Sequence, residues 1–408
     1  MIGPADWKGL QKPFPFSLPT QIEYGPGVSE TVAVHVAALG ECVAIVTDPG
    51  VVAAGLVEPV ERCLRDAGLR TEVFANVEAN PRVTTVDVIG GGIAAAGADV
   101  IVGLGGGSAL DSAKAAAAVA TFGGTVLDYE GLEAVPGPCV PVVAMPTTAG
   151  TGSEVTAWAI VTDVRRHYKM AVGSRQLMPR VAIVDPLLTL SLPASLTAGT
   201  GMDALTHAVE AYTARCSNPV SDALALYAIE LISEHIERAT FEGGDEDARC
   251  GMMLGSLLAG IAFGNADTAA VHAMGEALGG LLDIGHGVAN AMCLPFVVEH
   301  NAGAVPEKTA RMGRAMRLPT DGLGPAAARD LTVAALHHLL DRLGIPTLPE
   351  AGVEESHLPE LVRIACMNTG NPDNPVLVGS AEFEALFRAA LNPASRQREG
   401  LAKGMGDT

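Results

Sequence analysis

Four side chains in the second half of the sequence have the types and spacing of metal ligands. Asp203 and His207 lie four positions apart in a stretch that reads as helix, so they share one helix face. His272 follows on a second helix-like stretch, and His286 comes after a glycine-rich break. Three imidazoles and a carboxylate suit Zn²⁺ or Fe²⁺ better than Ca²⁺ or Mg²⁺, which prefer oxygen. We expect a divalent metal site, against the alternative of ordinary core or surface polar residues.

A glycine-rich turn in the first half could hold a phosphate group. Residues 98–104 predict a buried strand and residues 109–120 a helix, with Gly105, Gly106, Gly107 and Ser108 between them. Such a turn lets backbone N–H groups approach a pyrophosphate, whose charge then faces the positive end of the helix. The spacing matches neither G-x-G-x-x-G nor a Walker loop, so tight packing alone would also explain it.

Asp48 ends an earlier predicted strand, residues 43–47. An acid at this place can hydrogen-bond a ribose 2′-hydroxyl and repel a 2′-phosphate, which favours NAD over NADP. No Arg or Lys follows within the next several residues to bind a phosphate. The run Asp48-Pro49-Gly50 could equally be a simple turn.

Several motifs together resemble the iron-containing (group III) alcohol dehydrogenases across nearly the whole length. They are GGGSALDSAK at 105–114, PTTAGTGSEVT at 146–156, Asp-Pro at 185–186, residues 203–210, and HGVANA at 286–291. The resemblance assigns the metal-ligand positions to Asp203, His207, His272 and His286, with Fe²⁺ favoured and Zn²⁺ left open. It assigns cofactor-contacting positions to the following residues: Asp48, Asn80, Gly105, Gly106, Gly107, Ser108, Asp111, Thr147, Thr148, Thr151 and Lys169.

The resemblance also implies a fold and a reaction. The fold is an α/β, Rossmann-like dinucleotide-binding domain with a parallel sheet, followed by an all-α domain, as in dehydroquinate synthase. The reaction is metal-dependent hydride transfer between NAD(H) and a primary or small secondary alcohol or its aldehyde. A homodimer or larger oligomer is expected. The alternatives are a maleylacetate reductase-type or other specialised carbonyl reductase, a dehydroquinate synthase-like lyase, and a protein that keeps the fold without catalysis.

One position departs from the family pattern. Many members carry a second histidine four residues after the ligand that matches His272, and here that position is Glu276. As an i+4 neighbour it shares the helix face of His272. Glu276 is therefore the candidate catalytic residue, as a proton shuttle, a further ligand, or a partner for a polar or cationic substrate. A carboxylate here argues against dicarboxylate substrates. An ordinary solvated or salt-bridged glutamate is the alternative.

The pattern of elements changes near Pro193. Before it, short apolar strands alternate with helices, which indicates a parallel sheet covered by helices. We expect residues 155–162, 170–171 and 181–184 to extend it in antiparallel fashion. After it, long helical segments follow, including residues 201–214, 219–236, 247–263, 326–343 and 381–390. We therefore predict an NAD-binding domain at 1–193, a metal-binding domain at 194–408, and an active site between them.

Composition narrows the class of protein. The 408 residues are 49% hydrophobic and 18% charged, which excludes a disordered or fibrous chain. The net charge of −20 argues against nucleic acid or an anionic membrane as a partner. Seven scattered cysteines without a C-x-x-C pair suit a reducing compartment. With no signal-peptide pattern and no apolar run of membrane-spanning length, we expect a cytoplasmic protein.

Overall fold

The computed structural model describes residues 13–166, 168–368 and 370–392, which fall into two compact units. The first, called here the α/β unit, comprises Leu18–Leu192 together with Gly243–Met253. The second, called here the helical unit, comprises residues 13–17, Pro193–Glu242 and the described residues from Leu254 onward. One border between the units falls at Pro193, and residues 13–17 and Gly243–Met253 each belong to the unit on the other side of it.

A parallel sheet of six strands forms the centre of the α/β unit, in the order β1-β9-β6-β4-β2-β3. Its strands are β1 (Gln21–Tyr24), β2 (Cys42–Val46), β3 (Arg70–Phe74), β4 (Val100–Gly105), β6 (Val142–Pro146) and β9 (Val181–Val184). The α-helices of this unit are α1 (Val32–Ala37), α2 (Pro49–Ala53), α3 (Val57–Asp66), α4 (Val83–Ala96) and α5 (Gly107–Phe122). The predicted parallel α/β architecture is confirmed.

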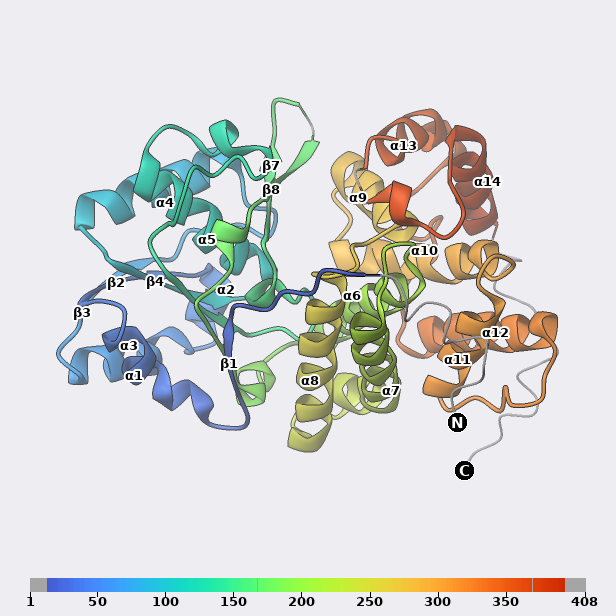
Figure 1. The fold of residues 1–408 in the computed structure, drawn as a ribbon, viewed down its shortest axis with the longest axis horizontal. Helices are drawn as coiled ribbons and strands as arrows, with labels where there is room; N and C mark the ends of the chain where they lie inside the picture. Colours follow the sequence, from blue (N-terminus) through green and yellow to red (C-terminus); the bar gives the residue numbers. More distant parts are fainter. Residues whose placement is uncertain (1–12, 167, 369, 393–408) are drawn as a thin grey trace. The chain divides into compact units, whose positions relative to one another are not determined.

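The four inner strands of the sheet are buried on both faces because they are apolar at successive positions rather than at alternate ones. Along β2, Val43 and Ile45 pack into one core cluster with α1 and α3, while Ala44 and Val46 pack into another with α4 and α5. Figure 1 shows these two helix pairs on opposite faces of the sheet. Such a covered parallel sheet leaves the carboxyl ends of its strands as the place for ligands.

A smaller sheet joins β5 (Gly131–Leu132), β8 (Tyr168–Gly173) and β7 (Trp158–Asp163) in that order. β7 and β8 are antiparallel, as expected for this region. The expectation was wrong for residues 181–184, because β9 runs parallel to both β1 and β6 inside the main sheet. Four consecutive buried apolar residues suit a central parallel strand, so the sequence itself favours this placement.

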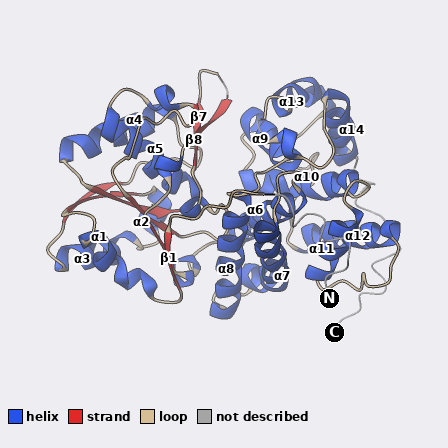
Figure 2. Cartoon of the chain, viewed as in Figure 1, coloured by secondary structure: helices blue, strands red, loops and turns tan. Residues whose placement is uncertain are grey.

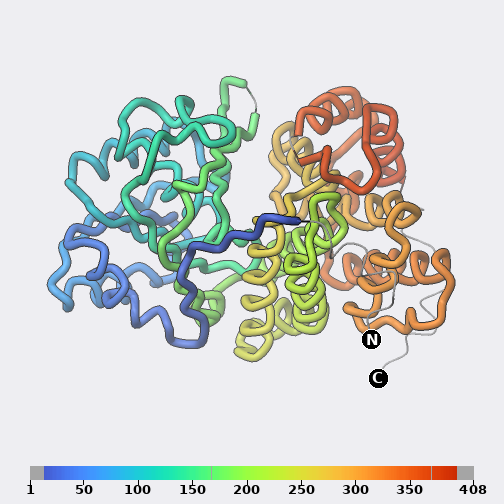
Figure 3. Tube along the Cα trace, in the orientation of Figure 1, coloured from blue at the N-terminus to red at the C-terminus, as the bar shows by residue number. Residues whose placement is uncertain are grey.

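The helical unit contains no strand among its described residues, as Figure 2 shows. Its helices are α6 (Ala194–Thr213), α7 (Pro219–Phe241), α8 (Glu246–Phe263, which begins in the α/β unit), α9 (Ala270–Leu282), α10 (His286–Asn301), α11 (Pro306–Ala315), α12 (Pro325–Arg342), α13 (Leu358–Ala365) and α14 (Ser380–Leu391). Figure 3 traces the chain through them, from yellow-green α6 to red α14. In the described part of the chain, no helix is both long and apolar enough to span a bilayer.

Candidate metal centre and cofactor site

Helix α6 carries three polar side chains on a single buried face. Asp203, His207 and Glu210 are spaced i, i+4 and i+7, so they stack along one side of the helix. Each of these residues is less than 5% exposed. Because burial of charged groups is costly unless they are paired or bind a metal, this face needs partners from elsewhere in the unit.

Helix α9 supplies the main partner, His272. One ligand atom from each of Asp203, His207 and His272 lies within 4.8 Å of the others. The Nε2 atoms of the two histidines are 3.0 Å apart, and Nε2 of His272 lies 3.9 Å from Asp203 Oδ1. An ion about 2.1 Å from each donor needs donors roughly 3.4 Å apart in a tetrahedral site. The three side chains predicted as ligands therefore fit one divalent ion.

His286, the fourth predicted ligand, stands at the first position of α10 and is more exposed than the others. Its Nε2 lies 3.6 Å from Oδ1 of Asp203, with 34% of the side chain accessible. The Asn290 amide bridges the two residues, because its Nδ2 is 2.8 Å from Asp203 Oδ1 and 3.2 Å from His286 Nε2. The structure thus places His286 beside the other three, at the open edge of the cluster.

Two glycines let the helices approach closely enough for this arrangement. A Cβ at Gly287 of α10 would collide with the carbonyl oxygen of Gly199 on α6 and would crowd Asp203. A Cβ at Gly275 of α9 would collide with the Asn290 side chain. Any larger residue at either position would push the ligand-bearing helices apart.

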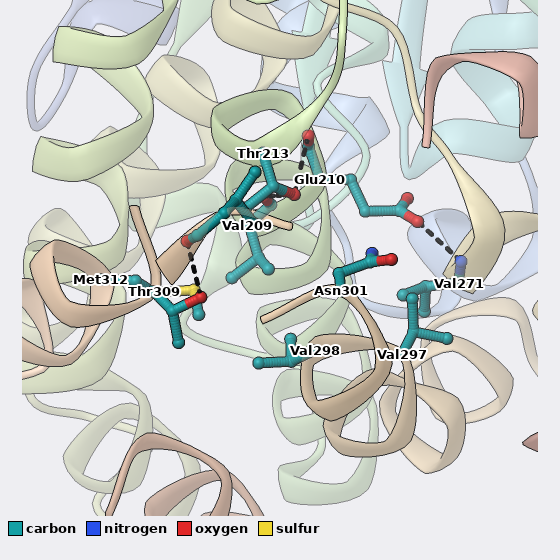
Figure 4. A pocket seen from close by; sticks show the side chains of 10 residues that line it. Val209, Glu210, Thr213, Val271, Val297, Val298, Asn301, Thr309 and Met312 are labelled. Atoms are coloured by element: carbon teal, nitrogen blue, oxygen red, sulfur yellow. Dashed lines mark hydrogen bonds between the residues drawn. The ribbon is translucent and has the colours of Figure 1, made fainter. Parts of the chain in front are cut away.

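Glu210 contacts Nδ1 of His272, the ring nitrogen that does not face His207. One carboxylate oxygen accepts the backbone N–H of Val271 at 2.7 Å, and the other lies 2.5 Å from Nδ1 of His272. A proton held on Nδ1 leaves Nε2 as the unprotonated nitrogen that a metal requires. Figure 4 shows the Glu210 carboxylate reaching Val271 across a pocket walled by Val209, Val297 and Val298.

The charges of the cluster shift its ionisation. Burial raises the pKa of the Asp203 carboxyl, but the imidazoles, led by His207, bring that pKa below its ordinary value. Burial lowers the pKa of His272, and Glu210 outweighs this effect and raises the pKa to about 8. The cluster therefore places carboxylate oxygens next to imidazole nitrogens. The negative charge of those oxygens would stabilise a bound cation.

Phe263 ends α8 and Asn265 follows it, while Glu276, the predicted catalytic residue, lies on α9. Phe263 stacks on the His207 ring, with centroids 4.2 Å apart and planes 14° apart. The Asn265 side chain bonds the backbone of Ser17 at 2.7 and 3.2 Å, which is a structural role. Glu276 is half-buried and accepts a 2.6 Å hydrogen bond from Asn368.

In the α/β unit, the glycine turn joins β4 directly to α5. Gly105 has a φ of 152°, and a Cβ there would come within 2.6 Å of the Ala109 Cβ. The side chain of Thr148 lies over Gly106, and that of Thr151 lies over Gly107. The Ser108 hydroxyl donates to the Ala79 carbonyl at 2.6 Å, next to Asn80 in sequence. The predicted phosphate turn and its predicted neighbours thus gather at the amino end of α5.

Asp48 occupies the carboxyl end of β2, which pairs with β4. Its Oδ1 accepts the N–H groups of Gly50 and Val51 at 2.8 and 3.0 Å, so the residue caps α2. Its Oδ2 faces the turn, 3.1 Å from the position that a Cβ on Gly105 would take. The turn interpretation is confirmed, and the ribose contact stays a prediction for a carboxylate that borders the glycine loop.

The remaining predicted cofactor residues are Thr147, Lys169 and Asp111, all in the α/β unit. The Thr147 N–H donates to the Gly105 carbonyl at 3.0 Å, which fixes the start of the Thr147–Thr151 segment beside the turn. Lys169 lies on β8 opposite Thr162. Asp111 behaves differently, because both carboxylate oxygens accept hydrogen bonds from the protein: from Ser153 at 2.6 Å and from Ile160 at 3.0 Å.

No role was predicted from the sequence for Glu210, Asn290 and Asn368, which contact predicted site residues in the structure. A signal existed for Glu210, since an acid three residues after His207 continues the ligand face of α6. Asn290 lies four residues after His286 and so shares its face. Asn368 is remote in sequence from Glu276, and no spacing rule would have found it.

Comparison with known proteins agrees with this geometry. A family model described as "Iron-containing alcohol dehydrogenase" matches residues 19–186, and one described as "Fe-containing alcohol dehydrogenase family, C-terminal" matches residues 197–391. The chain is 41% identical over 382 residues to a 1,3-propanediol dehydrogenase of Citrobacter freundii, covering 93% of this chain and 99% of the relative. It is 37% identical over 378 residues to an NAD-dependent methanol dehydrogenase of Bacillus methanolicus, covering 92% and 99%.

A solved structure agrees as well. The crystal structure of a 1,3-propanediol oxidoreductase superposes with a TM-score of 0.90 at 40% identity, covering 93% of this chain and all of the other. The fold, the cluster on α6, α9 and α10, and both family models therefore lead to one conclusion. The chain belongs to the iron-containing alcohol dehydrogenase family and is a metal-dependent oxidoreductase acting on alcohols or aldehydes.

Proposed function

We propose that this enzyme transfers a hydride between NAD(H) and a primary or small secondary alcohol or its aldehyde. The observation that carries the proposal is the convergence of Asp203, His207 and His272 within 4.8 Å, in a chain of this family. His286 completes the proposed ligand set. A bound divalent ion supplies Lewis acidity toward the substrate oxygen, and the nicotinamide supplies the hydride acceptor. We infer iron as the ion, with zinc compatible with the same donors.

In this reaction the protein's own side chains hold and orient the proposed metal ligands and the proposed proton-transfer group. Glu210 fixes the ring of His272, and Asn290 fixes the carboxylate of Asp203. Phe263 covers one face of His207 and so excludes water from that side. Glu276 is proposed to exchange a proton with the substrate hydroxyl, while Asn368 holds its carboxylate in place.

In the α/β unit we propose that the cofactor diphosphate lies on Gly105, Gly106, Gly107 and Ser108. The threonines at 147, 148 and 151 with Asn80 and Lys169 are proposed to complete its contacts. The amino end of a 16-residue helix favours negative charge there. Asp48 supports a choice of NAD over NADP, because its carboxylate borders the turn and would repel a 2′-phosphate. We further propose a cytoplasmic location, in line with the seven free cysteines, and a homo-oligomer, as the family resemblance implies.

Elemental analysis of the purified protein, followed by a panel of alcohols and aldehydes with NAD(H), tests this function. The expected result is one iron or zinc ion per chain and NAD-linked turnover of simple primary alcohols. His272→Ala should remove both the metal and the turnover while NADH binding persists, because His272 lies in the helical unit and the glycine turn in the other. Turnover by metal-free His272→Ala protein would refute the ligand assignment.

A further inference from the structure

The interior of the α/β unit contains a lysine that the proposed reaction does not use. Lys114, on the second turn of α5 after Asp111, has no solvent-accessible side-chain surface. Burial lowers the pKa of Lys114, and the neighbouring Asp111 carboxylate opposes that effect. Burying an ammonium group costs free energy unless the group is fully hydrogen-bonded. The hydrogen-bond partners of Lys114 therefore indicate its role.

The partners of Lys114 all lie on one stretch of chain outside its own helix, apart from Asp111. Its Nζ donates to the backbone carbonyls of Ser153 at 3.0 Å, of Thr156 at 3.5 Å and of Trp158. Nζ also lies 3.3 Å from Asp111 Oδ1. One ammonium group thus ties three backbone carbonyls of residues 153–158 to α5.

Asp111, three residues before Lys114 on α5, bonds the same segment. Its Oδ1 accepts the Ser153 hydroxyl at 2.6 Å, and its Oδ2 accepts the Ile160 N–H at 3.0 Å. The pair of side chains therefore forms five hydrogen bonds to residues 153–160. The Lys114 ammonium also neutralises the Asp111 carboxylate. The pair therefore adds no net negative charge that would oppose an anion at the start of α5.

The fastened segment is continuous with the residues that lie over the glycine turn. Ser153 follows Thr151, whose side chain would be 2.7 Å from a Cβ on Gly107, and Thr148 packs in the same way over Gly106. At its other end, the Thr147 N–H is held by the Gly105 carbonyl. Residues 147–153 are thus fixed at both ends above the amino terminus of α5.

We propose that Lys114 and Asp111 are positioning residues that hold residues 147–153 over the glycine turn and so set the affinity for the dinucleotide's diphosphate. This inference rests on the proposed NAD-dependent function. It assigns to Asp111 an indirect role in place of the direct cofactor contact expected from the sequence. Neither side chain touches the cofactor; both act through the loop that does.

The test replaces Lys114 by Met, which keeps the length of the side chain and removes its charge and hydrogen bonds. Lys114→Met should raise the Kd for NADH, measured by fluorescence titration, by about tenfold or more, since several buried hydrogen bonds are lost. The Kd for ADP-ribose, measured by competition, should rise in parallel, because the effect lies at the phosphates. Metal content should not change, since the ligands belong to the helical unit.

Two control variants on α5 separate positioning from stability. Ser112→Ala removes a buried hydroxyl that has no hydrogen-bond partner among the described residues, and it should leave the Kd within about twofold of the wild type. Val119→Ala leaves a cavity further along the helix and should lower Tm while NADH binding persists. If Val119→Ala weakens NADH as much as Lys114→Met at equal loss of Tm, the inference is overturned.

Unchanged NADH and ADP-ribose affinity in Lys114→Met would also overturn it. If that variant does not fold, Ser153→Ala removes a single bond to Asp111 and should still raise the Kd by about two- to fivefold. No change in Ser153→Ala would then count against the inference. A wild-type protein that binds no NADH would instead refute the proposed function, which is a separate outcome.

Discussion

Replacing Glu210 by Gln would test whether the carboxylate behind His272 controls metal affinity. In the native arrangement one oxygen accepts from the Val271 N–H and the other faces Nδ1 of His272. Glutamine has one acceptor oxygen and one NH₂ group, so it cannot accept from both. If its oxygen keeps the Val271 bond, its NH₂ must donate to Nδ1, which moves the imidazole proton to Nε2. That is the nitrogen that faces Asp203 and His207.

The size of the effect follows from this change of tautomer. Loss of a carboxylate that orients a ligating histidine costs about 10- to 100-fold in metal affinity. At 1.36 kcal/mol per tenfold change, this is about 1.4 to 2.7 kcal/mol. The loss of metal affinity in Glu210→Gln should lie toward the upper end of this range. Glu210 is only 2% exposed, so water cannot substitute for the lost contact.

The assay is a competition between the metal-free protein and a chelator of known affinity, with Co²⁺ absorption as a second readout. Thr213→Val is the matched control, because Thr213 lines the same pocket on α6 and bonds only its own helix, at Val209 and Glu210. Glu210→Gln should bind the ion at least about tenfold more weakly, and Thr213→Val should bind it normally. A folded Glu210→Gln protein with wild-type affinity would refute the role of the carboxylate.

Three further substitutions have defined outcomes. Asp48→Gly should shift the NAD:NADP ratio of kcat/KM toward NADP, and an unchanged ratio would remove Asp48 from the ribose site. Glu276→Gln should slow turnover or displace its pH profile if Glu276 relays protons, whereas a wild-type profile would make it structural. Burial raises the pKa of Glu154 to about 7, so the folded protein retains a proton that the unfolded chain releases above about pH 4.5. Stability should therefore fall between about pH 4.5 and 7, by up to about 3 kcal/mol, and urea denaturation of Glu154→Gln should show this fall reduced; an identical pH dependence would contradict the burial argument.

The sequence predicted the metal cluster and the parallel sheet because the residue patterns that form them have few other structural roles. The helical spacing of Asp203 and His207, with His272 in a second helix-like segment, predicted the cluster on α6 and α9. Strand–helix alternation predicted the parallel sheet for a similar reason, since parallel strands need helical crossovers.

Long-range partnerships could not be derived in this way. Nothing in the sequence pairs Asn368 with Glu276, since 92 residues separate them and a hydrogen bond leaves no periodic trace. The partners of Lys114 were equally hidden, because backbone carbonyls carry no residue identity. For Asp111, the motif predicted a cofactor contact but did not show that both carboxylate oxygens accept hydrogen bonds from Ser153 and Ile160.

The pairing of β1 with β9 has a consequence for how the protein is made. Among the described strands, β1 (residues 21–24) is the first in the chain, and in the sheet it pairs only with β9 (residues 181–184), which is the last. At about 5 to 20 residues per second, the nascent chain must wait roughly ten to thirty seconds for that partner. A slowly translated stretch before codon 181 would lengthen the interval, and with it the time during which an unpaired strand is open to chaperones and to association with other copies.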